Sequence, residues 1–244
     1  MYKRQDDILI ALNEKRERIS VLNDYDSYLQ KLEQQLAKKE KELAQISDEV
    51  SEIRQRSAVK LVSEIKSALN DLNFLDVQFD MQFDRLPDYT ANGIDAPEFL
   101  ISTNPGEPLK PLGKVASGGE LSRIMLGIKT IMAENDHIES LIFDEIDSGI
   151  SGRTAQMVSE KMNELGRNHQ IICITHLPQI AAMADAHFLI EKAVENKSTV
   201  SRIRRLTDND SVAELARMLG GAKITDTVME SAREMKALAM EKKI

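Results

Sequence analysis

The feature that most constrains this chain is a long N-terminal stretch without helix breakers. Residues 1–57 contain neither glycine nor proline, which favours one uninterrupted helix. Ten positions in it follow one another in steps of three and four: Leu22, Tyr25, Leu29, Leu32, Leu36, Lys39, Leu43, Ile46, Val50 and Ile53. Nine of these ten side chains can bury apolar surface. Lys39 is the exception. A seam sustained over more than four heptads predicts a coiled coil.

A seam this narrow is not stable without a partner helix. The sequence contains no second stretch with a comparable heptad pattern. A single amphipathic helix lying on a globular core would satisfy the same residues in another way. We therefore assign residues 1–60 to a coiled-coil helix, with this alternative open, and residues 61–244 to a globular part.

The composition supports long charged helices joined to one compact domain. The 244 residues are 30% charged and include no Trp, four Tyr and six Phe. The net charge of −8 gives no general argument for nucleic-acid binding. A single cysteine, Cys173, excludes an internal disulfide and a Cys-rich zinc site, and its apolar surroundings indicate a core thiol. No apolar run approaches the roughly 18 residues of a membrane span, so we expect a cytoplasmic protein.

After the helical stretch the hydrophobic period changes from helical to alternating. Residues 77–84 (VQFDMQFD) alternate apolar and polar side chains, which predicts a half-buried strand. Asn92-Gly93 is a turn signal, and residues 98–103 are the expected return strand. Residues 104–113 contain three Pro and two Gly and are expected to form a loop.

From residue 114 onward, apolar strand patterns alternate with helical patterns. The expected helices are 118–135, 151–166, 177–185, 211–221 and 224–243, and the expected strands are 140–145, 170–176, 186–194 and 198–206. Buried strands that alternate with helices predict an α/β fold with a mainly parallel sheet and flanking helices.

Two adjacent carboxylates end one of these strands. Residues 141–145 read LIFDE, so three apolar residues lead into Asp144 and Glu145. Ligands of parallel sheets bind beyond the carboxyl ends of strands, where an Asp suits a hydrated Mg²⁺. The adjacent Glu can orient or deprotonate an attacking water. This is the layout of a nucleotide-hydrolysing Walker B strand, although a strand that ends in two solvated acids fits the same letters.

A glycine-containing loop precedes the helix that leads to this strand. Residues 117–123 read SGGELSR. The two glycines let the backbone approach a ligand closely, and the amides of a helix N-terminus favour an anion such as phosphate. Ser117 adds a hydroxyl donor. The alternative is a flexible loop with a serine helix cap.

Two further polar residues follow strands of the same expected sheet. His176 follows the apolar run 171–175 of the expected strand and precedes Pro178, where it could contact a terminal phosphate. Asp147 lies in the glycine-containing loop that follows the two acids. A lone His at a strand end is more often structural, so its meaning depends on the neighbouring motifs.

Taken together, these four segments match the order and spacing of the signature motif, Walker B strand, D-loop and H-loop of ATP-binding-cassette ATPases. The strings VASGGELSRIMLGIK, LIFDEIDSGISGR and ICITHLPQIA closely resemble the RecN family, bacterial double-strand-break repair proteins related to SMC proteins. The resemblance covers roughly residues 100–235 in motif detail. It implies the C-terminal lobe of an ABC/SMC-type ATPase head, preceded by the returning arm of a coiled coil.

The resemblance also implies roles for single residues. In that family ATP and Mg²⁺ are held between two heads, and the signature of one head caps the γ-phosphate bound to the other. By resemblance, Asp144 is the Mg²⁺-associated acid, Glu145 the catalytic base and His176 the switch histidine. The signature residues are Ser117, Gly118, Gly119 and Glu120, and Asp147 is the D-loop acid.

The chain departs from the family pattern because it has no Walker A loop. The pattern G-x-x-x-x-G-K-[ST] fails at the only Gly-Lys pair, Gly113-Lys114, because Val115 follows it and Pro108 stands at the first glycine position. We interpret the chain as the C-terminal part of a longer protein, with little ATPase activity alone. The expected partners are the N-terminal lobe of the same protein, a second head in an ATP-bound homodimer, and DNA.

Other interpretations remain at this stage. A non-enzymatic coiled-coil scaffold, or another head of the SMC type, would also explain parts of the sequence. Arg202, Arg204 and Arg205 could contact DNA or belong to a solvated edge strand, with the first two on one face. Arg123 and Arg153 flank the expected nucleotide region, where we expect head-to-head contacts or local ion pairs.

Overall fold

The computed structural model describes residues 2–114, 118–133, 138–195, 198–221 and 223–243. Contacts between residues divide the chain into two compact units, which are described separately. Unit 1 comprises Met1–Ser57 and Phe83–Ala96, and unit 2 comprises Ala58–Gln82 and Pro97–Ile244.

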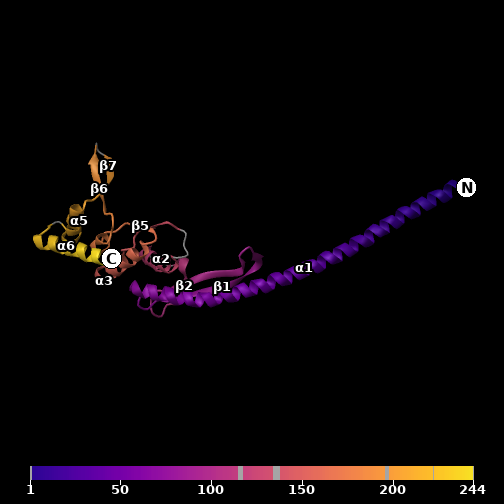
Figure 1. Cartoon of the computed structure of the whole chain (residues 1–244), viewed down its shortest axis with the longest axis horizontal. Coiled ribbons are helices and arrows are strands. Elements are labelled where there is room, and N and C mark those ends of the chain that lie inside the picture. Colours follow the sequence, from indigo (N-terminus) through magenta and orange to yellow (C-terminus); the bar gives the residue numbers. More distant parts are fainter. Residues whose placement is uncertain (1, 115–117, 134–137, 196–197, 222, 244) are drawn as a thin grey trace. The chain divides into compact units, whose positions relative to one another are not determined.

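The expected N-terminal helix is confirmed as one continuous element, α1 (Tyr2–Asp71), drawn in indigo to violet in Figure 1. Two long strands follow it, β1 (Gln78–Thr90) and β2 (Gly93–Ser102), joined by the expected Asn92-Gly93 turn. Gly93 has φ +94°, a backbone conformation that favours glycine. Both strands extend further than the alternating pattern alone predicted.

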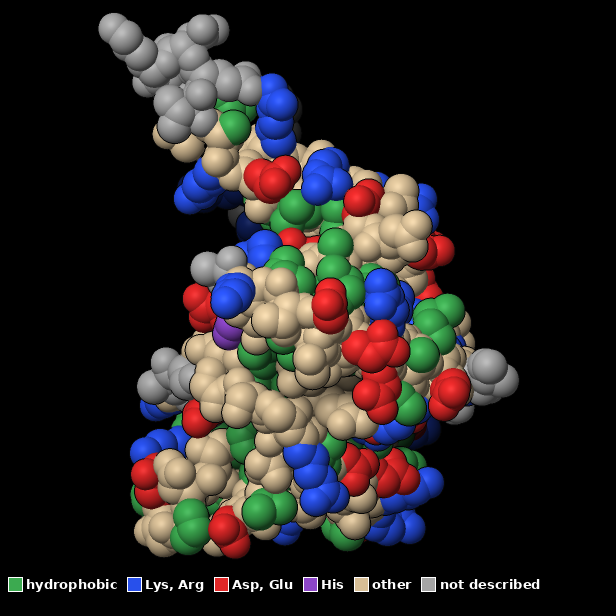
Figure 2. All heavy atoms as spheres, turned by 90° about the vertical axis from the view of Figure 1, so that its left-hand side faces the viewer, with side chains coloured by type: hydrophobic (Ala, Val, Ile, Leu, Met, Phe, Trp, Pro, Cys, Tyr) green, Lys and Arg blue, Asp and Glu red, His purple; other side chains and the backbone are tan. Residues whose placement is uncertain are grey.

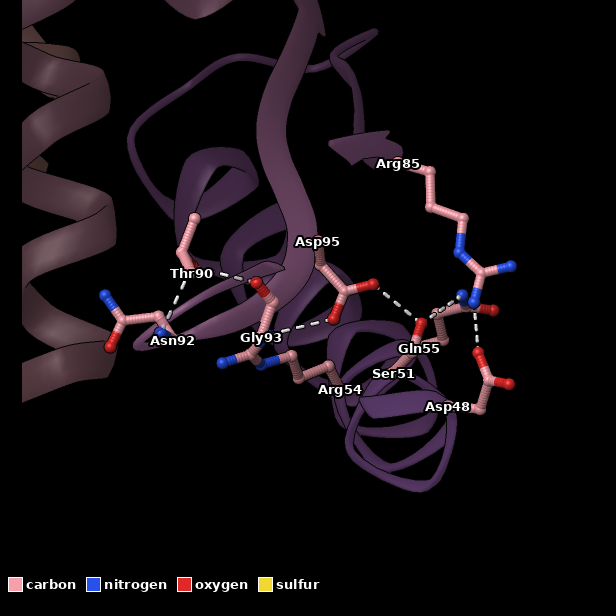
Figure 3. Close-up of polar contacts among 9 residues, drawn as sticks. All are labelled: Asp48, Ser51, Arg54, Gln55, Arg85, Thr90, Asn92, Gly93 and Asp95. Carbon is pink, nitrogen blue, oxygen red and sulfur yellow. Dashed lines mark hydrogen bonds and ion pairs between the residues drawn. The ribbon is translucent and has the colours of Figure 1, made fainter. Parts of the chain in front are cut away.

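In unit 1 the tip of the β1–β2 hairpin is bonded to α1 through a polar network (Figure 3). Asp95 on β2 accepts hydrogen bonds from the Ser51 hydroxyl at 2.7 Å and from Arg54 Nη1 at 2.9 Å. Arg85 on β1 forms an ion pair with Asp48 on the helix. The hairpin is therefore held on the helix by directed polar contacts.

The heptad seam of α1 lies on a different face from the one that contacts the hairpin. Ser47 is buried, whereas the seam residues Leu43, Ile46 and Ile53 are exposed. The hairpin thus occupies a face made of small and polar residues. The apolar seam is therefore open to another partner. Within this unit it does not pack on a globular core.

Unit 2 contains the remaining elements in the order that the sequence predicted, except for β3 (Lys110–Pro111) and the 3₁₀ turn after it, which begin within the segment 104–113 that was expected to be a loop. After them come α2 (Gly118–Met132), β4 (Ser140–Phe143), α3 (Gly152–Leu165), β5 (Gln170–Cys173), α4 (Pro178–Ala182), β6 (Phe188–Glu195), β7 (Ser198–Arg205), α5 (Asp208–Gly220) and α6 (Asp226–Glu241). Three clusters of buried apolar side chains hold them together, centred on α3, on α2 with the end of α1, and on α4–α6.

The parallel part of the fold consists, among the described residues, of β4 and β5 alone. They pair in register from Ser140↔Gln170 to Phe143↔Cys173. The strands β2–β3 and β6–β7 pair antiparallel, and β1 joins β2 and β3 in one sheet. The expected mainly parallel sheet is therefore limited to this pair in the part of the chain that the structure describes.

The β4–β5 pair is covered on one face only within this unit. Phe143 belongs to the cluster built around Val158 and Met162 of α3. On the other face Ile142 is 70% exposed and its partner Ile172 is 47% exposed. The expectation that both strands are buried is thus wrong for this face, because no described element of the chain packs over these side chains.

Candidate functional site

The two acids lie just beyond the end of β4, as the sequence predicted. Asp144 and Glu145 are exposed, and the next residue, Ile146, is fully buried in the core and anchors the loop. The Asp144 Oδ1 atom accepts a hydrogen bond from the Glu145 amide at 2.8 Å. Glu145 has φ +56°, a left-handed conformation that is uncommon outside glycine and that marks a constrained position.

The glycines of the expected signature loop lie against these acids in the same chain. A Cβ atom added to Gly119 would lie 2.8 Å from the Glu145 carbonyl oxygen and 2.7 Å from the Ser148 Cβ atom. One added to Gly118 would lie 2.5 Å from Glu145 Oε2. At Gly119 only a residue without a side chain fits, so the start of α2 packs directly on the acidic loop. Ser117 lies outside the described residues.

Side chains of the first turns of α2 strengthen this contact. The Ser122 hydroxyl donates to the Asp144 carbonyl oxygen at 2.8 Å. Glu120, the last of the four expected signature residues, is half-buried on the same helix. These contacts with α2 therefore hold the backbone that carries Asp144 and Glu145.

Arg123 makes local structural contacts beside the acidic loop. It is buried, and its Nη1 atom donates to the carbonyl oxygens of Ile146 at 3.2 Å and Ser148 at 2.8 Å, with its guanidinium 5.6 Å from the centre of the Phe74 ring. Burial lowers the pKa of the guanidinium, and the charge of Glu120 raises it. Its contacts join α2 to the acidic loop, so it makes local contacts, with backbone carbonyl oxygens as hydrogen-bond partners. A head-to-head contact stays a prediction.

Asp147 joins the acidic loop to the loop that carries His176. Its buried Oδ2 atom accepts from the Thr175 hydroxyl at 2.6 Å and from the His176 amide at 2.7 Å, and it lies 2.9 Å from His176 Nδ1. The His176 ring itself is mostly exposed. The loops after β4 and β5 are thus bonded to each other, as expected for strand ends on one edge of a parallel pair.

The donor set at this edge fits a nucleotide-bound magnesium ion better than a metal site formed by protein alone. Among the residues that the structure describes, no group of three or more His, Cys, Asp or Glu side chains could hold a metal ion. Mg²⁺ is usually held by one or two carboxylates together with phosphate oxygens and water. The exposed Asp144 carboxylate fits the role of such a single protein ligand.

Cys173 on β5 is half-buried and packs against the cluster around α3. Burial, followed by the charges of Asp147 and Asp144, raises its pKa to about 12. A thiol with so high a pKa carries almost no thiolate at neutral pH, and the thiolate is the nucleophile. This agrees with the expectation of a core thiol.

The arginines of β7 are arranged as the sequence predicted but not as a single basic surface. In the β6–β7 register Arg202 lies opposite Glu191 and Arg204 opposite Leu189, so both share a face, whereas Arg205 lies opposite Phe188 on the other. Arg204 lies 3.5 Å from the Glu191 carboxylate. On the face seen in Figure 2 basic and acidic side chains are intermixed. DNA contact by these residues stays a prediction.

No helix in the described part of the chain combines the length and apolarity that crossing a bilayer requires. No protein-family model matches the chain. A solved Smc head domain with a coiled coil and joint, derived from Pyrococcus yayanosii, aligns with a TM-score of 0.50 and 20% identity over 70% of this chain and 31% of that one. Because the identity is this low, the likeness shows the fold alone. The fold is that of an SMC-type head lobe preceded by a long helix.

Two bacterial proteins are similar in sequence. The chain is 41% identical to DNA repair protein RecN of Bacillus subtilis over 94% of its own length and 42% of that protein. It is 40% identical to DNA repair protein RecN of Vibrio cholerae over 75% of its own length and 33% of that protein. The chain thus spans less than half of the curated relatives it matches. With its motifs and fold, these identities place the chain in the RecN family.

Proposed function

We propose that the chain is the C-terminal lobe of a RecN-like ATPase head. In this proposal it supplies the signature loop, the Walker B acids, the D-loop and the switch histidine of an ATP site. The observation that carries it is the meeting of three segments at one edge of the β4–β5 pair, namely the start of α2 and the loops after β4 and β5. Gly119 packs on the acidic loop, and Asp147 of that loop is bonded to the loop of His176.

The chemistry follows from the exposed groups at this edge. Glu145 is placed to take a proton from the water that attacks the terminal phosphorus, since its carboxylate is exposed just beyond the strand end. Asp144 would hold Mg²⁺, which neutralises phosphate charge when bound. His176 would contact the terminal phosphate. Residues 117–120 would cap the phosphates that are bound to a second head, so that two heads form a homodimer when ATP is bound.

The exposed face of the β4–β5 pair is an argument for a second lobe that packs on it in this assembly. Parallel sheets are normally covered on both faces, yet Ile142, Ile172 and Ile174 are exposed here. We propose that the lobe carrying the Walker A loop covers them and completes the phosphate cradle. This chain alone would then hydrolyse ATP very slowly, and the whole protein would act in DNA double-strand-break repair and recombination, at the nucleoid in the cytoplasm.

The direct test compares ATP turnover of the chain alone and of the chain joined to the N-terminal lobe of a RecN relative. Turnover is expected only in the joined protein. Glu145→Gln in that protein should lower the rate of ATP hydrolysis by at least a factor of about 100, which is the usual loss of rate when a general base is removed. Nucleotide binding should persist. Rapid hydrolysis by the chain alone would contradict the split site.

A non-enzymatic scaffold is the second candidate, and the exposed seam of α1 favours it. Leu29, Leu32 and Leu36 are all open to solvent. The seam has the heptad spacing of a two-helix contact, and we propose that an antiparallel arm of the same protein occupies it. A scaffold without catalysis would show normal assembly in the joined protein and the same ATP turnover with and without Glu145→Gln.

A further inference from the structure

Asp147 makes contacts that its proposed place in the D-loop does not require. Its side chain is 6% exposed, although it is an acid in a loop beside exposed Asp144 and Glu145. A buried carboxylate is costly unless donors surround it. Two donors bond its Oδ2 atom, the Thr175 hydroxyl at 2.6 Å and the His176 amide at 2.7 Å, and the His176 Nδ1 atom lies 2.9 Å from the same oxygen.

The contact with the ring has a chemical consequence that the other two contacts lack. An ionised carboxylate can only accept hydrogen bonds. At 2.9 Å a lone pair on His176 Nδ1 would face the lone pairs of Oδ2, so this close approach favours a proton on Nδ1. In the neutral ring Nε2 is then left without one. The partner of one ring nitrogen sets the state of the other, as it does for carboxylates that orient catalytic histidines.

The surroundings explain why the ring needs a fixed partner. The His176 side chain is 72% exposed, so packing alone does not hold it. The loop beneath it is short, because β5 ends at Cys173 and α4 begins at Pro178. The Leu177 amide also donates to the Thr175 hydroxyl at 3.0 Å, which fixes the loop backbone around the carboxylate.

We propose that Asp147 is a positioning residue for His176, which holds the ring proton on Nδ1 and leaves Nε2 as the nitrogen that a ligand can reach. This inference rests on the proposed function for its purpose, since Nε2 would be the atom that meets the terminal phosphate. It assigns Asp147 a role within its own chain, in addition to any contact with a second head.

The first experiment measures the protonated nitrogen of His176 directly. Long-range proton–nitrogen NMR spectra of the chain, labelled with ¹⁵N at histidine and recorded at alkaline pH, distinguish the two neutral tautomers. The chain has four histidines, so His176→Gln assigns the signal of interest. The expected result is that His176 is mainly the Nδ1–H tautomer. A wild-type ring that is mainly Nε2–H overturns the proposal without any variant.

The variants separate orientation of the ring from support of the loop. Asp147→Ala removes the acceptor and is expected to shift His176 to the Nε2–H tautomer. Asp147→Asn keeps a neutral acceptor of the same shape and should give an intermediate population, which decides the matter if the alanine variant fails to fold. Thr175→Val is the matched control, because it removes one bond to Asp147 but leaves the ring contact. An equal shift in Thr175→Val and Asp147→Asn, or no shift in any Asp147 variant, overturns the proposal.

The second experiment uses the joined protein and reads ATP turnover. Asp147→Asn is expected to lower kcat by a factor of about 10 to 100, the usual cost of losing the partner of a functional histidine, with KM for ATP nearly unchanged. A raised KM with unchanged kcat would contradict a positioning role. Glu145→Gln in the same assay tests the proposed function by itself, so the two failures can be told apart.

Discussion

At the scale of single residues, the neighbouring glycines Gly118 and Gly119 differ in what a side chain at each position would meet. A Cβ atom at Gly119 would meet backbone and a Cβ atom of the acidic loop, neither of which can rotate away. At Gly118 it would meet only the end of the Glu145 side chain. The sequence identifies both glycines, but only the structure distinguishes their surroundings.

We therefore expect opposite responses to alanine at these two positions. Gly119→Ala should lower the free energy of unfolding of the chain by about 1 to 3 kcal/mol, the usual cost of overpacking. Gly118→Ala should be neutral or stabilising, by up to about 1 kcal/mol, because alanine favours helix over glycine. Urea unfolding of both variants provides the measurement, and equal destabilisation by the two would contradict the close contact at Gly119.

His187 gives a pH dependence whose direction the structure fixes. Its Nδ1 atom lies 2.9 Å from the Ser211 hydroxyl, and burial lowers its pKa, with the charge of Glu214 opposing this and that of Lys236 adding to it. Below the ordinary histidine pKa the unfolded chain binds a proton that the folded chain does not. The stability of the fold should therefore fall as the pH drops below about 6.5.

The variant His187→Asn should remove this part of the pH dependence. The free energy of unfolding of the wild-type chain should decrease more between pH 7.5 and pH 5.5 than that of the variant, because asparagine does not titrate. Urea midpoints at the two pH values give the comparison. If both proteins lose the same stability over this interval, His187 does not titrate as its burial requires.

At the scale of elements, the contact of α1 with the β1–β2 hairpin depends on Asp95. The Ser51 hydrogen bond is the largest cause that lowers the Asp95 pKa, followed among the favourable contacts by Arg54, while burial raises it. Because the folded-state pKa is lowered, this carboxylate stabilises the fold above its unfolded pKa of 3.8, and the contribution is lost as the pH falls through the folded-state value.

Asp95→Asn should loosen the hairpin tip from the helix. Hydrogen exchange at the amides of residues 93–96 is expected to become faster at neutral pH, because the charged partner of Arg54 is gone. Asp88→Asn, at an exposed position of the same hairpin, is the matched control and should leave exchange unchanged. Unchanged exchange in Asp95→Asn would show that the polar network does not hold the tip.

At the scale of the whole molecule, one face of the β4–β5 pair lacks a cover within the described chain. Two isoleucines four positions apart differ sharply, since Ile142 is 70% exposed and Ile146 is fully buried. A parallel pair exposed in this way is what a separated lobe of a larger head would present. The difference gives a test that uses the same substitution twice.

Ile146→Ala should cost this chain about 2 to 5 kcal/mol of unfolding free energy, because it empties a buried site. Ile142→Ala should change it by less than about 0.5 kcal/mol, as surface substitutions do. By contrast, Ile142→Ala should weaken the binding of a separately produced N-terminal lobe. Calorimetric titration that finds Ile142→Ala without effect on this binding would place the lobe elsewhere.

Local rules made much of this chain predictable. Helix α1 follows from the absence of breakers, the β1–β2 turn from Asn92-Gly93, and the acids at the end of β4 from an apolar run that stops at Asp144. Arg123 could not be assigned in this way. An arginine after a signature motif has the same letters whether it is exposed or buried, and its carbonyl partners are distant in sequence.

The sequence by itself predicted the elements other than β3 and singled out the candidate site residues, because helix period, turn chemistry and motif order are properties of neighbouring residues. The tertiary structure alone decided which groups meet. Asp147 and His176 are 29 positions apart, and their contact exists because parallel strands bring their carboxyl ends to one edge. It also decided that Ile142 is exposed and Ile146 is buried, since burial depends on what packs against a strand and not on the strand's own letters.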